Sequence, residues 1–188
     1  MSVTPTSSRA APSEVTLIPA TLDGAAQLAR TAAALFEQTF GDANTPEDMR
    51  AYLADAFSEA RQRAELADER NRIWLARAPN GSIVGYAHVR LEAPAPHHAA
   101  SVRGAEIARL YADRAWHGRG LGAWLMHTCI AVARENQAEV LWLGVWERNA
   151  RAITFYEKQG FHIIGEQSFM LGADRQRDLV MALDLTTE

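Results

Sequence analysis

Apolar residues in the first third of the chain recur first at strand spacing and then at helix spacing. Residues 15–18 predict a short strand, and residues 22–40 predict a helix whose apolar positions return every three or four residues until Gly41. The segment Thr45-Pro46-Glu47-Asp48 combines an N-cap, a proline at the first helical position and two first-turn carboxylates. From this start we expect one long helix that continues to about residue 68.

The rest of the chain alternates strand and helix patterns. Residues 72–78 and 83–91 predict two strands joined by Asn80-Gly81, the signal of a tight hairpin, and the proline-containing residues 92–100 predict a loop. Further strands are expected at residues 106–111, 140–146, 161–169 and 178–185, and helices at residues 120–136 and 150–159. This order of elements predicts an α/β fold with a mixed sheet and helices packed on its faces.

Composition limits the class of protein. The 188 residues are 48% hydrophobic and carry a net charge of -4, which fits one globular domain and gives no reason to expect a nucleic-acid or membrane partner. The only cysteine, Cys129, excludes an intramolecular disulfide and a cysteine-based metal cluster. No apolar stretch is long enough to span a bilayer and no secretion signal is evident, so we expect a cytoplasmic protein. Residues 1–13 read as a disordered tail.

A glycine-rich turn lies between the strand at residues 106–111 and the helix that follows. Its sequence, His117-Gly118-Arg119-Gly120-Leu121-Gly122, lets a ligand approach the backbone, and the helix start adds free N–H groups and a positive dipole end. We therefore predict a phosphate or diphosphate site, to which Arg114 and Arg119 could add charge; a turn that merely packs is the alternative. A dinucleotide fingerprint fits less well, because Glu139 opens the next strand and Glu147 comes late.

This turn resembles the pyrophosphate-binding motif Q/R-x-x-G-x-G/A of the Gcn5-related N-acetyltransferase (GNAT) superfamily, from which only His117 departs. The segment from Asn149 to Phe161 is similar to the superfamily's N-x-x-A-x-x-F-Y-x-x-x-G-F signature. The resemblance implies an acetyl-CoA-dependent N-acetyltransferase whose single domain spans residues 14–188. It also implies a central sheet of six to seven strands flanked by about four helices, and a homodimer as a family-level expectation.

The resemblance also implies a role for individual residues. The amide of Leu110 would polarise the acetyl carbonyl, Glu106 would act as general base, Asn149 would contact the pantetheine arm, and Tyr156 would protonate the departing thiolate. The positions that would bind acetyl-CoA are Leu110, Tyr111, Ala112, His117, Gly118, Arg119, Gly120, Leu121, Gly122, Asn149 and Tyr156.

These residue types suit acetyl transfer to an amine. An alkylammonium has a pKa of about 10.4, so a carboxylate such as Glu106 is needed to take its proton, directly or through water. A tyrosine with a pKa of about 10 stays protonated and can donate to a thiolate. Attack would be direct, in a ternary complex. Each residue has a structural alternative: Glu106 could pair with Arg109 or Arg103, and the Tyr156 ring could belong to the core.

Residues 36–49, 143–149 and 171–179 resemble PaiA-type polyamine N-acetyltransferases, which act on spermidine and spermine. This resemblance implies a polyamine or another small primary amine as acceptor. The alternatives are an amino acid, an antibiotic or a protein amine, and, outside catalysis, a silent acyl-CoA-binding module.

Several polar groups can be interpreted either as functional or as structural. Cys129 lies in an apolar stretch and is expected to be an inert buried thiol, and His97 and His98 lack a third ligand, so we predict a solvated loop and no metal. Four acidic residues near the first two helices either attract a polyamine or form a solvated face. They are Glu37, Asp42, Glu47 and Asp48.

Overall fold

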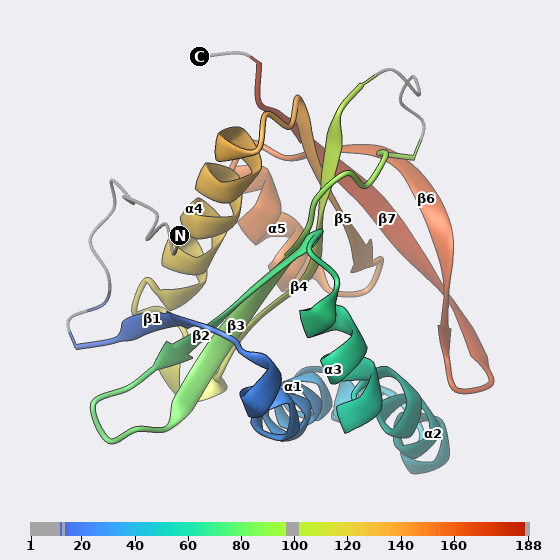
Figure 1. The fold of residues 1–188 in the computed structure, drawn as a ribbon. Coiled ribbons are helices and arrows are strands. Elements are labelled where there is room, and N and C mark those ends of the chain that lie inside the picture. The colour runs from blue at the N-terminus through green and yellow to red at the C-terminus, as the bar shows by residue number, and fades with distance from the viewer. Residues whose placement is uncertain (1–11, 13, 97–101, 187–188) are drawn as a thin grey trace.

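The computed structural model describes residues 12, 14–96 and 102–186, in which seven strands form one mixed sheet (Figure 1). The strand order is β1-β2-β3-β4-β5-β7-β6, and β4 and β5 form the one parallel pair in that order. The strands are β1 (Thr16–Pro19), β2 (Asn71–Arg77), β3 (Ile83–Arg90), β4 (Gly104–Ala112), β5 (Val140–Trp146), β6 (His162–Leu171) and β7 (Asp174–Asp184). The mixed α/β fold expected from the sequence is confirmed.

Helices cover both faces of this sheet (Figure 1). They are α1 (Ala25–Phe40), α2 (Pro46–Ala56), α3 (Glu59–Ala67), α4 (Leu121–Glu135) and α5 (Ala150–Lys158). On one face Tyr86 joins an apolar cluster with α1, α2 and α3, and on the other Ala87 joins a larger cluster with α4 and α5. Among the described residues no helix is both long and apolar enough to cross a bilayer.

The long helix expected to reach residue 68 is instead two helices, so the described residues form five α-helices rather than about four. The break falls at Phe57 and Ser58. The Ser58 hydroxyl accepts the backbone N–H of Arg61 at 3.2 Å, which caps α3 and competes with continuation of α2. Phe57 is 4% exposed and packs against the ring of Phe36, so burial of this side chain favours the bend.

The last strand is longer than the apolar pattern predicted. β7 begins at Asp174, four residues before the expected start at Asp178. The sequence did not predict this part of the strand because residues 174–178 are all polar and show no strand pattern. Gly172, with φ of +61°, makes the tight turn that pairs Leu171 with Asp174. The consequence for the site is that Asp178 lies inside the sheet, paired with Trp146 of β5 and Gln167 of β6.

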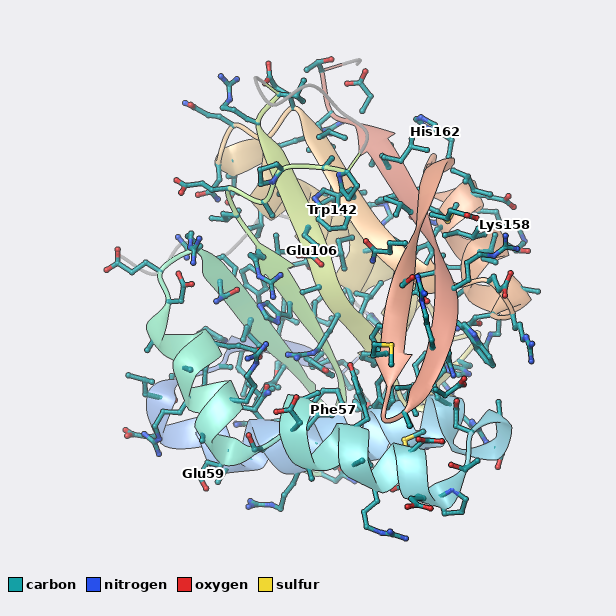
Figure 2. The ribbon with its side chains drawn as sticks, turned by 90° about the vertical axis from the view of Figure 1, so that its right-hand side faces the viewer. Phe57, Glu59, Glu106, Trp142, Lys158 and His162 are labelled. Carbon is teal, nitrogen blue, oxygen red and sulfur yellow. The ribbon has the colours of Figure 1, made fainter. Side chains whose placement is uncertain are left out.

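The two central strands separate part-way along their length. β4 and β5 pair from Gly104–Val140 to Glu106–Trp142 and then diverge. Figure 2 shows Glu106 and Trp142 side by side at the last of these pairs. Because successive backbone amides point to opposite edges of a strand, residues 107–112 and 143–146 present unpaired backbone groups to the gap. The site is built around this gap.

Candidate active site

A cavity of about 510 Å³ opens where β4 and β5 diverge. Its walls come from α1, α2, β4, the start of α4, β5, α5 and the β6–β7 hairpin. It collects almost every residue that the sequence singled out for the site; Arg119 does not line it. The predicted residues that line it are Glu106, Leu110, Tyr111, Ala112, His117, Gly118, Gly120, Leu121, Gly122, Asn149 and Tyr156.

The glycine-rich loop has the geometry of an anion cradle. Gly118 and Gly120 have φ of +75° and +85°, and nothing lies within 4 Å of where their Cβ atoms would stand. Among the described residues none accepts a hydrogen bond from the backbone N–H of Gly120, Leu121 or Gly122, so these donors and the helix dipole face outward together. The cradle fits the diphosphate of coenzyme A.

The two basic side chains proposed for the cradle and the histidine that begins it have other contacts. His117 Nε2 donates to the Ala112 carbonyl at 2.9 Å and ties the loop to the end of β4. The Arg119 guanidinium lies over the ring of Trp116, 5.5 Å from its centroid, and Arg114 faces Asp42 at 3.5 Å. Backbone amides therefore dominate the cradle, which explains why histidine is acceptable at its first position.

Tyr156 and Asn149 both belong to the α5 end of the cavity. The Asn149 Oδ1 caps α5 by accepting the Ala152 N–H at 3.1 Å, which leaves its Nδ2 free to donate. The half-buried ring of Tyr156 packs against Phe155 and Phe161, and no described residue bonds its hydroxyl. Burial raises the pKa of Tyr156, so the hydroxyl remains a proton donor.

Glu106 has a partner that the sequence did not predict. It forms an ion pair with Arg90 of β3 at 2.6 Å, whereas Arg109 pairs with Glu65 and Arg103 pairs with Glu139. The expected partners Arg109 and Arg103 were therefore wrong, because strand register places Arg90 directly opposite Glu106. Burial raises the pKa of Glu106, and Arg90 and then Arg109 oppose that rise.

The acidic cluster proposed to attract an acceptor does not line the cavity. Asp48 accepts the Ala173 N–H at 2.8 Å and a hydrogen bond from the Thr45 hydroxyl, and these bonds lower its pKa. Asp48 thus tethers α2 to the β6–β7 turn. Glu37 and Glu47 are exposed, and Asp42 faces Arg114, so this group is a solvated and structural face.

Sequence reasoning missed the other carboxylate of the cavity, Asp178. It is 8% exposed, and desolvation raises its pKa to about 6. Its Oδ2 lies 3.3 Å from where a Cβ of Gly144 would stand, so the glycine leaves the carboxylate open to the cavity. The sequence carried no local signal for this role, because residues 174–178 are all polar and Asp178 cannot be told from its neighbours.

Cys129 takes no part in the site. Cys129 is buried in the middle of α4, and burial raises the pKa of its thiol to about 12, which suits the inert role expected for it. His97 and His98 lie outside the described residues. Within the described ranges no group of three or more potential metal-ligating side chains comes together.

The fold and the cavity are those of an acetyl-CoA-dependent acyltransferase. Residues 32–161 match the sequence model of the Acetyltransferase (GNAT) family, and the chain belongs to this family. An uncharacterized N-acetyltransferase of Mycobacterium bovis is 37% identical over 163 residues, which is 85% of this chain and 96% of the relative. The chain is therefore an N-acetyltransferase, with acetyl-CoA as its acetyl donor.

A second relative and a solved structure are similar over different lengths. The streptothricin acetyltransferase of Streptomyces lavendulae is 30% identical over 123 residues, which is 65% of this chain and 61% of the relative. The crystal structure of a PaiA N-acetyltransferase from Thermoplasma acidophilum in complex with coenzyme A superposes with a TM-score of 0.74. It shares 15% identity over 91% of this chain and 99% of its own, a level that shows the common fold.

Proposed function

We propose that this N-acetyltransferase acetylates a primary amine of a small cationic acceptor, with a polyamine as the first candidate, and that residues 14–188 form its domain. The observation that carries the proposal is the continuity of the cavity. The glycine cradle, Tyr156 and the buried carboxylate of Asp178 line one and the same cavity. The resemblance of residues 36–49, 143–149 and 171–179 to PaiA-type enzymes supports the same acceptor class.

In this proposal acetyl-CoA is a substrate, and the chain's residues hold it in an extended path. The amides of Gly118, Arg119, Gly120, Leu121 and Gly122, with His117 fixing the loop, would bind the diphosphate. The β4 segment of Leu110, Tyr111 and Ala112 and the amide of Asn149 would face the pantetheine arm and the thioester. An N–H of Leu110 preorganised by β4 would stabilise negative charge on the thioester oxygen.

Two side chains would move the protons. Glu106 would accept a proton from the acceptor ammonium, directly or through water, while the amine nitrogen forms its bond to the acetyl carbon. The carbon–sulfur bond would break, and Tyr156 would give its proton to the sulfur. The ammonium loses two N–H protons in all: the first goes to Glu106 and on to solvent, and the second, lost from the nitrogen after attack, replaces through water the proton that Tyr156 gives to the sulfur. The products are the acetylated amine, the free thiol of coenzyme A and one proton. Transfer would be direct, because Cys129, the chain's only thiol, is buried inside α4.

A second candidate acceptor is the amine of an antibiotic. The similarity to the streptothricin acetyltransferase of Streptomyces lavendulae favours this candidate. Such an acceptor also carries a primary amine, so the same donor site and the same proton transfers would serve it. An amino acid or a protein amine is a further alternative. A silent acyl-CoA-binding module would bind the donor and transfer nothing.

The experiment is to measure thiol release from acetyl-CoA by the purified protein with and without spermidine, and to weigh the product by mass spectrometry. Release that depends on spermidine, with a product heavier by one acetyl group, is the expected result. Thiol release with streptothricin but not with spermidine would identify the antibiotic, rather than the polyamine, as the acceptor class. Binding of acetyl-CoA without turnover on any amine tested would overturn the enzymatic role assigned to Glu106 and Tyr156.

A further inference from the structure

The carboxylate of Asp178 is buried and has no hydrogen-bond or ion-pair partner among the described residues. The residue is 8% exposed, and no described residue hydrogen-bonds its Oδ1 or forms an ion pair with it. Moving a carboxylate out of water without a partner is unfavourable by several kcal/mol in general, so proteins rarely keep such a group. A group of this kind that lines a cavity calls for a ligand that supplies the missing positive charge or hydrogen-bond donors.

No cation of the cavity wall supplies that charge. Arg109 is held by Glu65 through two bonds, of 2.6 Å and 3.1 Å. Arg90 is held by Glu106, and Arg151 of α5 lines the same cavity but forms no ion pair with Asp178. The nearest neutral donor is the side-chain amide of Gln167, whose Nε2 lies 2.7 Å from where a Cβ of Gly144 would stand, beside Asp178 Oδ2 at 3.3 Å, but it forms no hydrogen bond with the carboxylate and carries no charge. The cavity therefore contains two carboxylates and a counter-ion for only one of them.

Aromatic rings line the same cavity as the open carboxylate. They come from separate elements and touch one another: Tyr52 and Phe169 have centroids 5.3 Å apart, and Phe40 and Trp146 have centroids 6.2 Å apart. The negative faces of aromatic rings attract organic cations, and rings also exclude the water that would otherwise solvate Asp178. A single carboxylate in a cavity lined by aromatic rings favours an alkylammonium over a metal ion, because a metal ion would need several oxygen ligands.

We propose that Asp178 binds a second cationic centre of the acceptor, one that is not acetylated. This inference rests on the function proposed above. The reacting nitrogen must lose a proton and become neutral before it attacks, so it cannot balance a permanent charge on the cavity wall. A separate ammonium stays protonated through the reaction and can balance Asp178 throughout. Asp178 is thus a specificity-determining residue for diamines and longer polyamines, and the proton acceptor at the reacting nitrogen is a different group.

The test compares two acceptors of the same chain length, 1,4-diaminobutane and 1-aminobutane. The wild-type protein is expected to have the higher kcat/KM with the diamine. Asp178→Asn keeps the shape and removes the charge, and it should lower kcat/KM for the diamine by about 10- to 100-fold, mainly through KM, and change the value for the monoamine by less than about threefold. Asp178→Glu keeps the charge and should keep a preference for the diamine.

Glu166→Gln is the matched control, because it removes one negative charge from the neighbouring strand β6 outside the cavity. It should leave the preference for the diamine unchanged. An equal fall for both acceptors in Asp178→Asn would overturn the proposal, since it would indicate a structural or general catalytic role. A diamine preference that survives in Asp178→Asn would overturn it as well.

Binding measured without turnover separates this inference from the proposed function. The thermal midpoint of the wild-type protein should rise on addition of 1,4-diaminobutane, and that of Asp178→Asn should not. If the diamine binds through Asp178 but is never acetylated, the inference stands and the polyamine substrate fails. If amines are acetylated and Asp178→Asn makes no difference, the proposed function stands and this inference fails. If the diamine neither binds nor reacts, both fail.

Discussion

Arg90 and Glu106 lie directly opposite one another on β3 and β4, with an ion pair of 2.6 Å between their side chains. The pair sits where β4 and β5 begin to separate, so the carboxylate proposed as general base has a fixed orientation at the start of the gap. The same guanidinium opposes the effect of burial on the pKa of Glu106. A residue that does not itself line the cavity therefore limits how far burial raises the pKa of the Glu106 carboxyl.

Replacement of Arg90 by glutamine should move the acid limb of the kcat/KM profile to higher pH. Loss of the positive charge raises the pKa of Glu106 further, and the base works only when deprotonated, so activity should fall more at pH 6 than at pH 8. A full pH profile of kcat/KM measures this shift. Arg103→Gln, which removes an exposed arginine paired with Glu139, is the control and should leave the profile in place. An unmoved acid limb in Arg90→Gln would count against Glu106 as the base.

Replacement of Tyr156 by phenylalanine should lower kcat by about 10²- to 10⁴-fold and leave the KM for acetyl-CoA nearly unchanged, because the hydroxyl is needed for proton transfer to the thiolate rather than for binding. Steady-state kinetics measure both constants. Tyr86→Phe is the matched control: its buried hydroxyl has no hydrogen-bond partner and lies outside the cavity, so kcat should not change. If Tyr156→Phe turns over within about twofold of the wild type, another group protonates the thiolate.

Replacement of Gly120 by alanine should raise the KM for acetyl-CoA by about tenfold or more. The added methyl group meets no protein atom within 4 Å, and it would occupy the space through which the diphosphate reaches the backbone. Gly81→Ala provides a close control, because Gly81 has φ of +84° against +85° for Gly120, equally open surroundings and a position in a distant hairpin. Both variants carry a similar backbone strain of about 1–2 kcal/mol. Equal KM values in the two variants would show that the loop does not bind the donor.

Replacement of Asp178 by asparagine should stabilise the protein without ligand at neutral pH. In the folded state the pKa of Asp178 is about 6, above its ordinary value of 3.8, so ionisation destabilises the folded state as pH rises from about 4 to about 6. Above that range the destabilisation is constant. Allowing for water in the cavity, we expect the variant to gain about 1–2 kcal/mol at pH 7.5, or roughly 2–8 °C in thermal midpoint.

Thermal melts at pH 4 and pH 7.5 measure this effect. The advantage of Asp178→Asn should shrink toward zero at pH 4, where the carboxylate is protonated in the folded protein. An advantage of the same size at both pH values would mean that the charge of Asp178 is not the cause. A variant that gains stability and loses the diamine would show that the carboxylate is retained for binding.

Local chemistry made part of the structure predictable. Two features depend only on residues within one turn and could therefore be predicted from the sequence. They are the cradle at Gly118 and Gly120 and the helix cap at Asn149. Ser58 also carried a local signal, but the helix-forming residues on both sides masked it. The partner of Glu106 and the isolation of Asp178 depend on strand register and on residues far apart in the chain, Arg90 and Gly144, and no local pattern specifies those pairings.

The short stretch of pairing between β4 and β5 divides the sheet into two parts. Strands β1–β4 form one part and strands β5–β7 the other. The β4–β5 pairing that joins them runs from Gly104–Val140 to Glu106–Trp142. The proposed chemistry takes place beside this short pairing. A donor lying in the gap would contact both parts of the sheet and so add to the apolar cluster that already joins them, which predicts that the donor stabilises the fold as well as supplying the acetyl group.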